Sequence, residues 1–167
     1  MRPPLNSLER GHRGARGFTL IEMVVVVLIV GILASAAMPL ASLHKQRARE
    51  SELRQNLRTI RNALDAYKKA YDAGRIEKRA DATGYPPRLE LLVTGVRDAQ
   101  SPKSSLIYFL RRLPRDPFAE PDVPDARTWG LRSYASPPEA PAAGADVFDV
   151  YSQAEGQGLD GTPYRSW

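Results

Sequence analysis

The sequence predicts an α+β fold in which one long N-terminal helix packs on a small antiparallel sheet. A charge-free apolar run occupies residues 23–41, and ~20 such residues are enough for a helix to cross a bilayer. Apolar residues then recur every three or four positions from Leu53 to Tyr71, which is the period of an amphipathic helix. Alternating apolar residues at 147–152 indicate a strand close to the C-terminus.

A basic leader precedes the apolar block. Residues 1–17 contain four arginines and one glutamate, a balance that keeps this end on the cytoplasmic side of a membrane. The apolar block reaches back to Phe18 and is interrupted only by Glu22. We therefore expect residues 18–41 to form a single transmembrane helix and residues 42–167 to form a domain on the outer side. A secretory signal peptide would instead carry its cleavage site after a shorter apolar stretch.

The same helix is expected to continue over residues 42–72. Residues 18–72 would then form one helix of ~80 Å at 1.5 Å per residue, and only lipid or other copies of the helix can cover its first half. Gly74 is a suitable stop signal. The apolar seam of the second half consists of Leu53, Leu57, Ile60, Leu64, Tyr67 and Tyr71.

A variable loop region and a C-terminal sheet are expected to complete the domain. Turn residues at 85–87 precede a short helix over 88–94, and residues 137–145, rich in Pro, Ala and Gly, indicate a hairpin loop. Strands are predicted at 131–135, at 147–152 and, weakly, at 164–167. Four aromatic residues are expected to pack the sheet onto the seam: Tyr134, Phe148, Tyr151 and Trp167.

The composition argues against an enzyme. The chain has no cysteine and two histidines, which excludes thiolate metal sites and a Cys nucleophile. His12 would be removed with the leader, and His44 lies among basic residues just beyond the apolar block, so no nucleophile and base pair survives. Glycines at 156, 158 and 161 match G-x-G-x-x-G, but the six residues that follow are too few for a phosphate-binding helix.

Charge is divided unevenly along the chain. Residues 44–69 carry eight basic and three acidic side chains, whereas residues 113–167 carry four basic and nine acidic ones. The two regions can attract each other within one subunit or between neighbours, or the basic residues can simply form a solvated helix face. A basic helix also leaves open a nucleic-acid partner, although a uniformly basic surface would be stronger evidence for one.

The segment Gly17-Phe18-Thr19-Leu20-Ile21-Glu22, followed by the apolar run, resembles the prepilin signature of type IV pilins and type II secretion pseudopilins. The resemblance implies a pilin-like fold. It also implies that a prepilin peptidase cleaves between Gly17 and Phe18 and methylates the new N-terminus. Glu22 then matches the fifth position of the mature family sequence, and Pro39 matches its helix-kinking proline.

Segments of the outer domain are similar, in the same order, to G-type major pseudopilins. An acidic stretch at 119–128 departs from the family, which usually has a short turn there. The matching segments are Tyr85-Pro86, Leu89 to Val93, Leu110 to Phe118, Trp129-Gly130 and Phe148 to Ser152.

This resemblance implies a structural subunit that polymerises through its N-terminal helix into a periplasmic filament and helps to drive export of folded proteins across the outer membrane. The implied partners are other copies of the chain, minor pseudopilins, the prepilin peptidase, membrane lipid, and the inner-membrane secretion platform with its ATPase. No nucleic-acid partner is expected for this function. The implied location is the bacterial inner membrane, crossed once, with the C-terminal domain in the periplasm.

Four residues are expected to serve assembly: Phe18, Glu22, Gly31 and Pro39. An ionised Glu22 among apolar residues costs up to ~2.5–3.5 kcal/mol at the centre of a membrane helix. The family resemblance implies that Glu22 pairs with the amine of Phe18 on an adjacent subunit; a side chain that snorkels to the membrane surface is the alternative. Pro39 removes a helix hydrogen bond and predicts a kink or a melted turn. Gly31 and Ser35 form a small-xxx-small pair that lets helices approach closely.

The C-terminal loop, residues 152–161, is the doubtful metal site. G-type pseudopilins typically bind Ca²⁺ there through backbone carbonyls and closely spaced aspartates, and Ca²⁺ takes ~6–8 oxygen ligands. Only Ser152, Glu155 and Asp160 are candidates here, and Thr162-Pro163-Tyr164 replaces the expected aspartates. We favour a loop without a cofactor, in which Ser152 and Asp160 bond to loop amides.

Two other classes of function remain open. A competence pseudopilin or type IV pilin-like protein that takes part in DNA uptake would use the basic residues of 44–69, and its DNA binding would depend steeply on salt. A single-pass anchored sensor or enzyme is disfavoured by Glu22 and by the missing catalytic residues.

Overall fold

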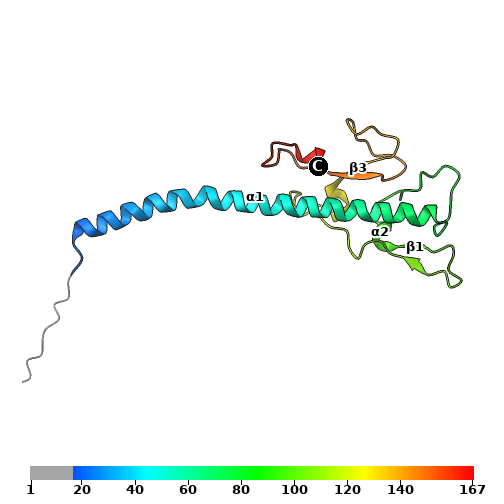
Figure 1. Ribbon diagram of the computed structural model, residues 1–167, viewed down its shortest axis with the longest axis horizontal. Helices are drawn as coiled ribbons and strands as arrows, with labels where there is room; N and C mark the ends of the chain where they lie inside the picture. Colours follow the sequence, from blue (N-terminus) through cyan, green and yellow to red (C-terminus); the bar gives the residue numbers. More distant parts are fainter. Residues whose placement is uncertain (1–16) are drawn as a thin grey trace, which may run out of the picture. The chain divides into compact units, whose positions relative to one another are not determined.

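The computed structural model describes residues 17–167, with the side chains of 36–41 left aside (Figure 1). The predicted leader therefore lies outside the described residues except for Gly17. The chain divides between Ser42 and Leu43 into two compact units, and each is described by itself below.

Helix α1, Leu20–Asp72, begins in the first unit and ends in the second. It starts at Leu20, two residues after the predicted helix start at Phe18, and the backbone stays helical through position 39. In the first unit, every side chain described between residues 17 and 35 is exposed. Over the residues that the structure describes, no helix is long and apolar enough to span a membrane.

In the second unit, α1 ends where the sequence predicts. Gly74 has a φ of 72°, a left-handed conformation that glycine adopts without a steric penalty. The N–H of Arg75 then donates to the carbonyl of Ala70 at 2.9 Å. This bond spans the helix end as in a Schellman motif and satisfies a carbonyl that the helix leaves unpaired.

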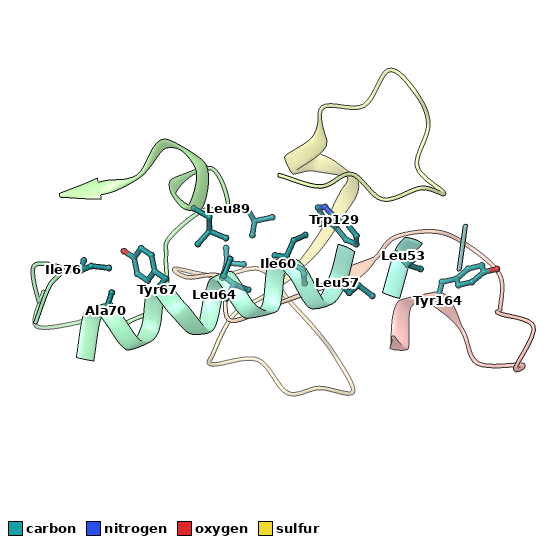
Figure 2. Close-up of a cluster of buried hydrophobic side chains, with 14 residues drawn as sticks. Leu53, Leu57, Ile60, Leu64, Tyr67, Ala70, Ile76, Leu89, Trp129 and Tyr164 are labelled. Atoms are coloured by element: carbon teal, nitrogen blue, oxygen red, sulfur yellow. The ribbon is translucent and has the colours of Figure 1, made fainter. Parts of the chain in front are cut away.

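The core of the second unit lies along one face of α1, as the seam predicts. Leu53, Leu57, Ile60, Leu64 and Tyr67 are all buried. Figure 2 shows them following one another along the helix, with Tyr164 at the Leu53 end and Ile76 at the other end. Covering side chains come from helix α2, the loops and the sheet; they include Leu89, Leu92, Trp129, Val147 and Val150.

A helix and a small hairpin follow α1. Helix α2, Leu91–Thr94, is shorter than the predicted 88–94. Strands β1, Val96–Arg97, and β2, Leu106–Ile107, form an antiparallel pair with Val96 opposite Ile107. The sequence did not predict this hairpin, because two-residue strands are too short to show an alternating pattern.

The second sheet contains β3, Trp129–Arg132, and β4, Asp149–Ser152. They pair antiparallel, with Trp129 opposite Ser152 and Arg132 opposite Asp149. The predicted strands at 131–135 and 147–152 are thus present with shifted ends, and a 3-10 turn, Asp125–Thr128, leads into β3. The third predicted strand, 164–167, is wrong: Tyr164–Ser166 is a 3-10 turn. The N–H groups of Ser166 and Trp167 donate locally to the carbonyls of Pro163 and Tyr164 instead of to a neighbouring strand.

The predicted packing of the four aromatic residues is largely wrong. Val150 and Ser152 are fully buried, so Tyr151 between them points to the opposite face of the sheet. Tyr134 is 62% exposed and lies against Tyr85 and Phe148, with ring centroids 6.1 and 5.4 Å away. Among the four, only Trp167 packs against the core.

Candidate functional site

The start of α1 has a hydrogen-bonded cap that includes Glu22. Thr19 Oγ1 accepts a hydrogen bond from the backbone N–H of Glu22 at 3.3 Å. Threonine followed three residues later by glutamate is the pattern of a capping box, and a carboxylate in the first turn also favours the positive end of the helix dipole. Glu22 therefore supports the helix start locally. Sequence reasoning overlooked Thr19, although the T-x-x-E spacing was available to find it.

The other assembly candidates lie on an exposed surface. Phe18 is 76% exposed, and a Cβ added at Gly31 would meet nothing within 4 Å. The hydroxyl of Ser35 donates to the carbonyl of Ile32 at 2.7 Å, so it is satisfied within its own helix. Pro39 is among the residues whose side chains lie outside the description, and its predicted kink stays a prediction.

Ser152, the first calcium candidate, is bonded inside the core. Its hydroxyl donates to Asp116 Oδ2 at 2.5 Å and accepts from the N–H of Ala154 at 3.1 Å. Asp116 is 1% exposed, and its other oxygen accepts from the N–H of Phe118 at 2.8 Å. The role of Asp116 was not predictable from the sequence, because nothing local connects it to a residue 36 positions later.

Asp160, the second candidate, has polar partners for both carboxylate oxygens. Oδ2 pairs with Arg54 Nη2 at 2.7 Å, and Oδ1 accepts from the amide and the hydroxyl of Thr162 at 2.9 and 2.6 Å. The bonds from Thr162, with a smaller contribution from Arg54, lower the pKa of Asp160. The amide bond is of the kind that the sequence predicted for this loop.

These residues do not fit a calcium site. Glu155, the third candidate, is exposed, Ser152 is engaged by Asp116, and Asp160 is neutralised by an arginine. Within residues 17–167, no three acidic or histidine side chains come together in a way that could hold a metal ion. Calcium takes several carboxylate oxygens at once in most protein sites, and the acidic side chains of this loop do not come together to offer them.

Helix α1 instead contacts the loop through Glu50. This side chain is 4% exposed and accepts hydrogen bonds from the N–H of Leu159 at 3.0 Å and from the Tyr164 hydroxyl at 3.1 Å. Gln46, one turn earlier, donates to the same carboxylate at 2.9 Å. Burial, and to a lesser extent the bond to Glu50, raises the pKa of Tyr164, while Gln46 lowers it.

Arg61 makes a second contact between α1 and the C-terminal part of the chain. Its guanidinium pairs with Asp149 at 2.8 Å and donates to the carbonyls of Val150 and Trp167 at 3.1 and 2.7 Å. Together with the Arg54–Asp160 pair, this shows that the basic helix and the acidic region attract each other within the subunit.

The acidic insertion at 119–128 is folded around Arg115. Its guanidinium donates to the carbonyls of Glu120 and Val123 and lies 3.8 Å from the carboxylate of Asp125. The carbonyl of Arg115 accepts from Asn56 on α1 at 2.8 Å. The insertion is therefore tied to the helix through one arginine.

Comparison with known proteins gives consistent matches. Residues 12–38 match the family model of the prokaryotic N-terminal methylation motif. Similar proteins include type II secretion system core protein G of Aeromonas hydrophila, 34% identical over 65% of this chain and 71% of that protein. The core protein G of Pseudomonas aeruginosa is 34% identical over 66% and 72%, and that of Vibrio cholerae is 34% identical over 64% and 67%. No solved structure matches this chain.

Proposed function

Because the chain belongs to the family of type II secretion system core protein G, we propose that it is the structural subunit of a secretion pseudopilus. It polymerises through residues 18–41 and does no chemistry itself. Before assembly, these residues anchor it in the inner membrane with residues 42–167 in the periplasm. Its partners are other copies of itself, minor pseudopilins, the prepilin peptidase, and the secretion platform with its ATPase.

The exposed apolar surface of α1 is the observation that carries this proposal. Leu20, Val27 and Leu33 are between 66% and 82% exposed, although burying each such side chain gains ~1.5–3 kcal/mol. Lipid or neighbouring helices therefore have to cover this part of the helix. A helix that is covered by lipid before assembly and by other copies of itself afterwards is what a filament assembled from membrane-anchored subunits requires.

Glu22 is proposed to set the register of that filament. Cleavage after Gly17 would create an amine at Phe18, four residues before the carboxylate. Pairing of this amine with Glu22 of a neighbouring subunit would neutralise both charges in an apolar environment, where an unpaired charge is costly. The capping bond to Thr19 uses the backbone amide of Glu22 and not its carboxylate.

Glu22→Leu tests the proposal, with Glu52→Leu as the matched control on an exposed position of the same helix. Full chains are expressed in a strain that lacks its own copy. We expect Glu22→Leu to insert in the membrane and to be cleaved at Phe18 by mass spectrometry, while filaments and secretion are lost. Glu52→Leu should retain both. Normal filaments and secretion with Glu22→Leu would contradict the register role.

The secretion function is preferred over DNA uptake. Two of the arginines that suggested a nucleic-acid surface, Arg54 and Arg61, are already paired with Asp160 and Asp149. The relatives reported above all carry the secretion name. DNA binding by the full chain that weakens steeply with salt would favour the alternative.

A further inference from the structure

We propose that Arg54 of α1 is the cation of the C-terminal loop and that the loop therefore folds without a bound metal ion. The inference concerns the fold of the subunit and does not rest on its assembly into a filament. In this loop, Ser152 and Asp160 are already bonded to Asp116 and Arg54.

The guanidinium of Arg54 contacts two groups of the C-terminal region, the carboxylate of Asp160 and the ring of Trp167. It pairs with Asp160 Oδ2 at 2.7 Å, and its central carbon lies 3.9 Å from the centre of the Trp167 ring. An arginine over an indole face is attracted by the π electrons, and its planar shape suits this stacking. Arg54 thus neutralises the loop carboxylate while its flat face rests on an aromatic side chain.

The indole is itself held in place by the loop. Trp167 Nε1 donates to the hydroxyl of Thr162 at 2.6 Å, and the same hydroxyl donates to Asp160 Oδ1 at 2.6 Å. Arg54, Asp160, Thr162 and Trp167 therefore form a closed ring of contacts. A metal ion would have to compete with Arg54 for Asp160 and would disturb this ring.

Glu50 secures the other side of the loop. It lies one helical turn before Arg54 and accepts the amide of Leu159, the residue before Asp160. Two successive loop residues are thus bound by two residues on one face of α1, one through a buried anion and one through a cation. The helix provides both charges, whereas a calcium loop gathers acidic side chains around an external ion.

The experiment uses the full chain in detergent micelles, and tryptophan fluorescence monitors its thermal unfolding. Both tryptophans, Trp129 and Trp167, lie in the second unit, so the signal reports on that unit. Arg54→Met is compared with Arg58→Met, which removes an exposed arginine one turn further along that makes no ion pair among the described residues. Each is measured in EGTA and in millimolar CaCl₂.

We expect the parent to unfold at the same temperature in EGTA and in calcium. Arg54→Met should unfold about 3–5 °C earlier, from the loss of one ion pair and one stacking contact in a domain of this size. Arg58→Met should match the parent. Asp160→Asn should lose less than Arg54→Met, because the stacking of Arg54 on Trp167 remains. The double variant should lose little more than Arg54→Met, because both changes break the same ion pair.

Two results would overturn the proposal. One is equal unfolding temperatures for Arg54→Met and Arg58→Met. The other is a rise of several degrees in calcium for the parent that disappears in Asp160→Asn, since a site held at ~100 times its Kd shifts stability by that much. If Arg54→Met does not fold, the decision passes to Asp160→Asn, which keeps an oxygen for Thr162 and removes only the charge.

Discussion

Asp116 shows how one buried side chain can join segments that are distant in the sequence. Its carboxylate binds Ser152 on β4 and the amide of Phe118, while its own amide donates to Thr128 Oγ1 at 3.2 Å. Thr128 in turn donates to the carbonyl of Asp125. A single buried aspartate therefore connects strand β4 with the 3-10 turn that ends the acidic insertion.

We expect Asp116→Ala to lower the free energy of unfolding by about 2–4 kcal/mol, because it leaves the buried Ser152 hydroxyl and the Phe118 amide without their charged partner. Ser152→Ala should cost less, about 1–2 kcal/mol, since Asp116 keeps its bond to Phe118. Urea unfolding measured by tryptophan fluorescence provides both values. Asp122→Ala, on the exposed part of the insertion, is the control, and a similar loss there would contradict the role of Asp116.

Asp98 predicts how stability changes in acid. Arg75 donates to its carboxylate at 2.6 and 3.2 Å, and this bond, followed by the amide of Gln100, lowers the pKa of Asp98. A depressed pKa in the folded state means that the stabilisation is complete above the unfolded value, ~3.9. It is lost as the pH falls through the folded pKa.

The stability of the second unit should therefore decrease below about pH 4, with Asp98 among the responsible groups. In Asp98→Asn this decrease should be shallower, while Glu139→Gln, at an exposed position, should follow the parent. Unfolding temperatures measured between pH 3 and pH 6 test this. Parallel pH curves for the parent and Asp98→Asn would show that the Arg75 pair does not contribute.

Among the elements, α1 was the most predictable from the sequence. Its seam repeats over about five turns, and Gly74 marks its end, so periodicity and one glycine were sufficient. The hairpin of β1 and β2 and the 3-10 turn at 164–166 were not predictable in this way, because their hydrogen bonds connect only a few residues. The contacts of Glu50, Arg54 and Asp116 were also missed, since each joins residues more than thirty positions apart.

The β3–β4 pair leaves no room at Gly130. A Cβ built there would lie 2.3 Å from the ring of Tyr151, its partner in the register. The glycine therefore lets the tyrosine ring lie flat across the outer face of β3. This arrangement also explains why Tyr151 covers the sheet rather than the seam.

Gly130→Ala should destabilise the second unit by about 1–3 kcal/mol, the usual cost of overpacking. Combining it with Tyr151→Ala should cost less than the sum of the two single changes, because the smaller side chain removes the clash. Chemical unfolding of the four proteins in this double-mutant cycle measures the coupling. Additive losses would mean that the ring moves aside without cost.

At the scale of the whole molecule, burial is confined to one of the two units. Every buried residue that the structure describes lies at position 50 or later, whereas residues 17–35 are exposed. We therefore expect the two units to depend on different surroundings: the first on lipid or other subunits, as proposed above, and the second on its own core.

A chain that contains only residues 43–167 should consequently fold alone. We expect a single cooperative transition at the same temperature as that of the full chain in detergent, measured by tryptophan fluorescence and by circular dichroism. A markedly lower temperature, or different transitions with the two probes, would show that residues before 43 contribute to the core.

The contacts of Glu50, Arg54 and Arg61 with the end of the chain also determine how the subunit carries mechanical load. These three residues extend over about 16 Å of helix at 1.5 Å per residue. They bind Leu159, Asp160 and Trp167, respectively. A force along the helix axis loads the three contacts in parallel, which is the shear geometry. The contacts therefore share the force instead of breaking one after another. A subunit pushed or pulled along its helix thus resists deformation with the combined strength of these contacts.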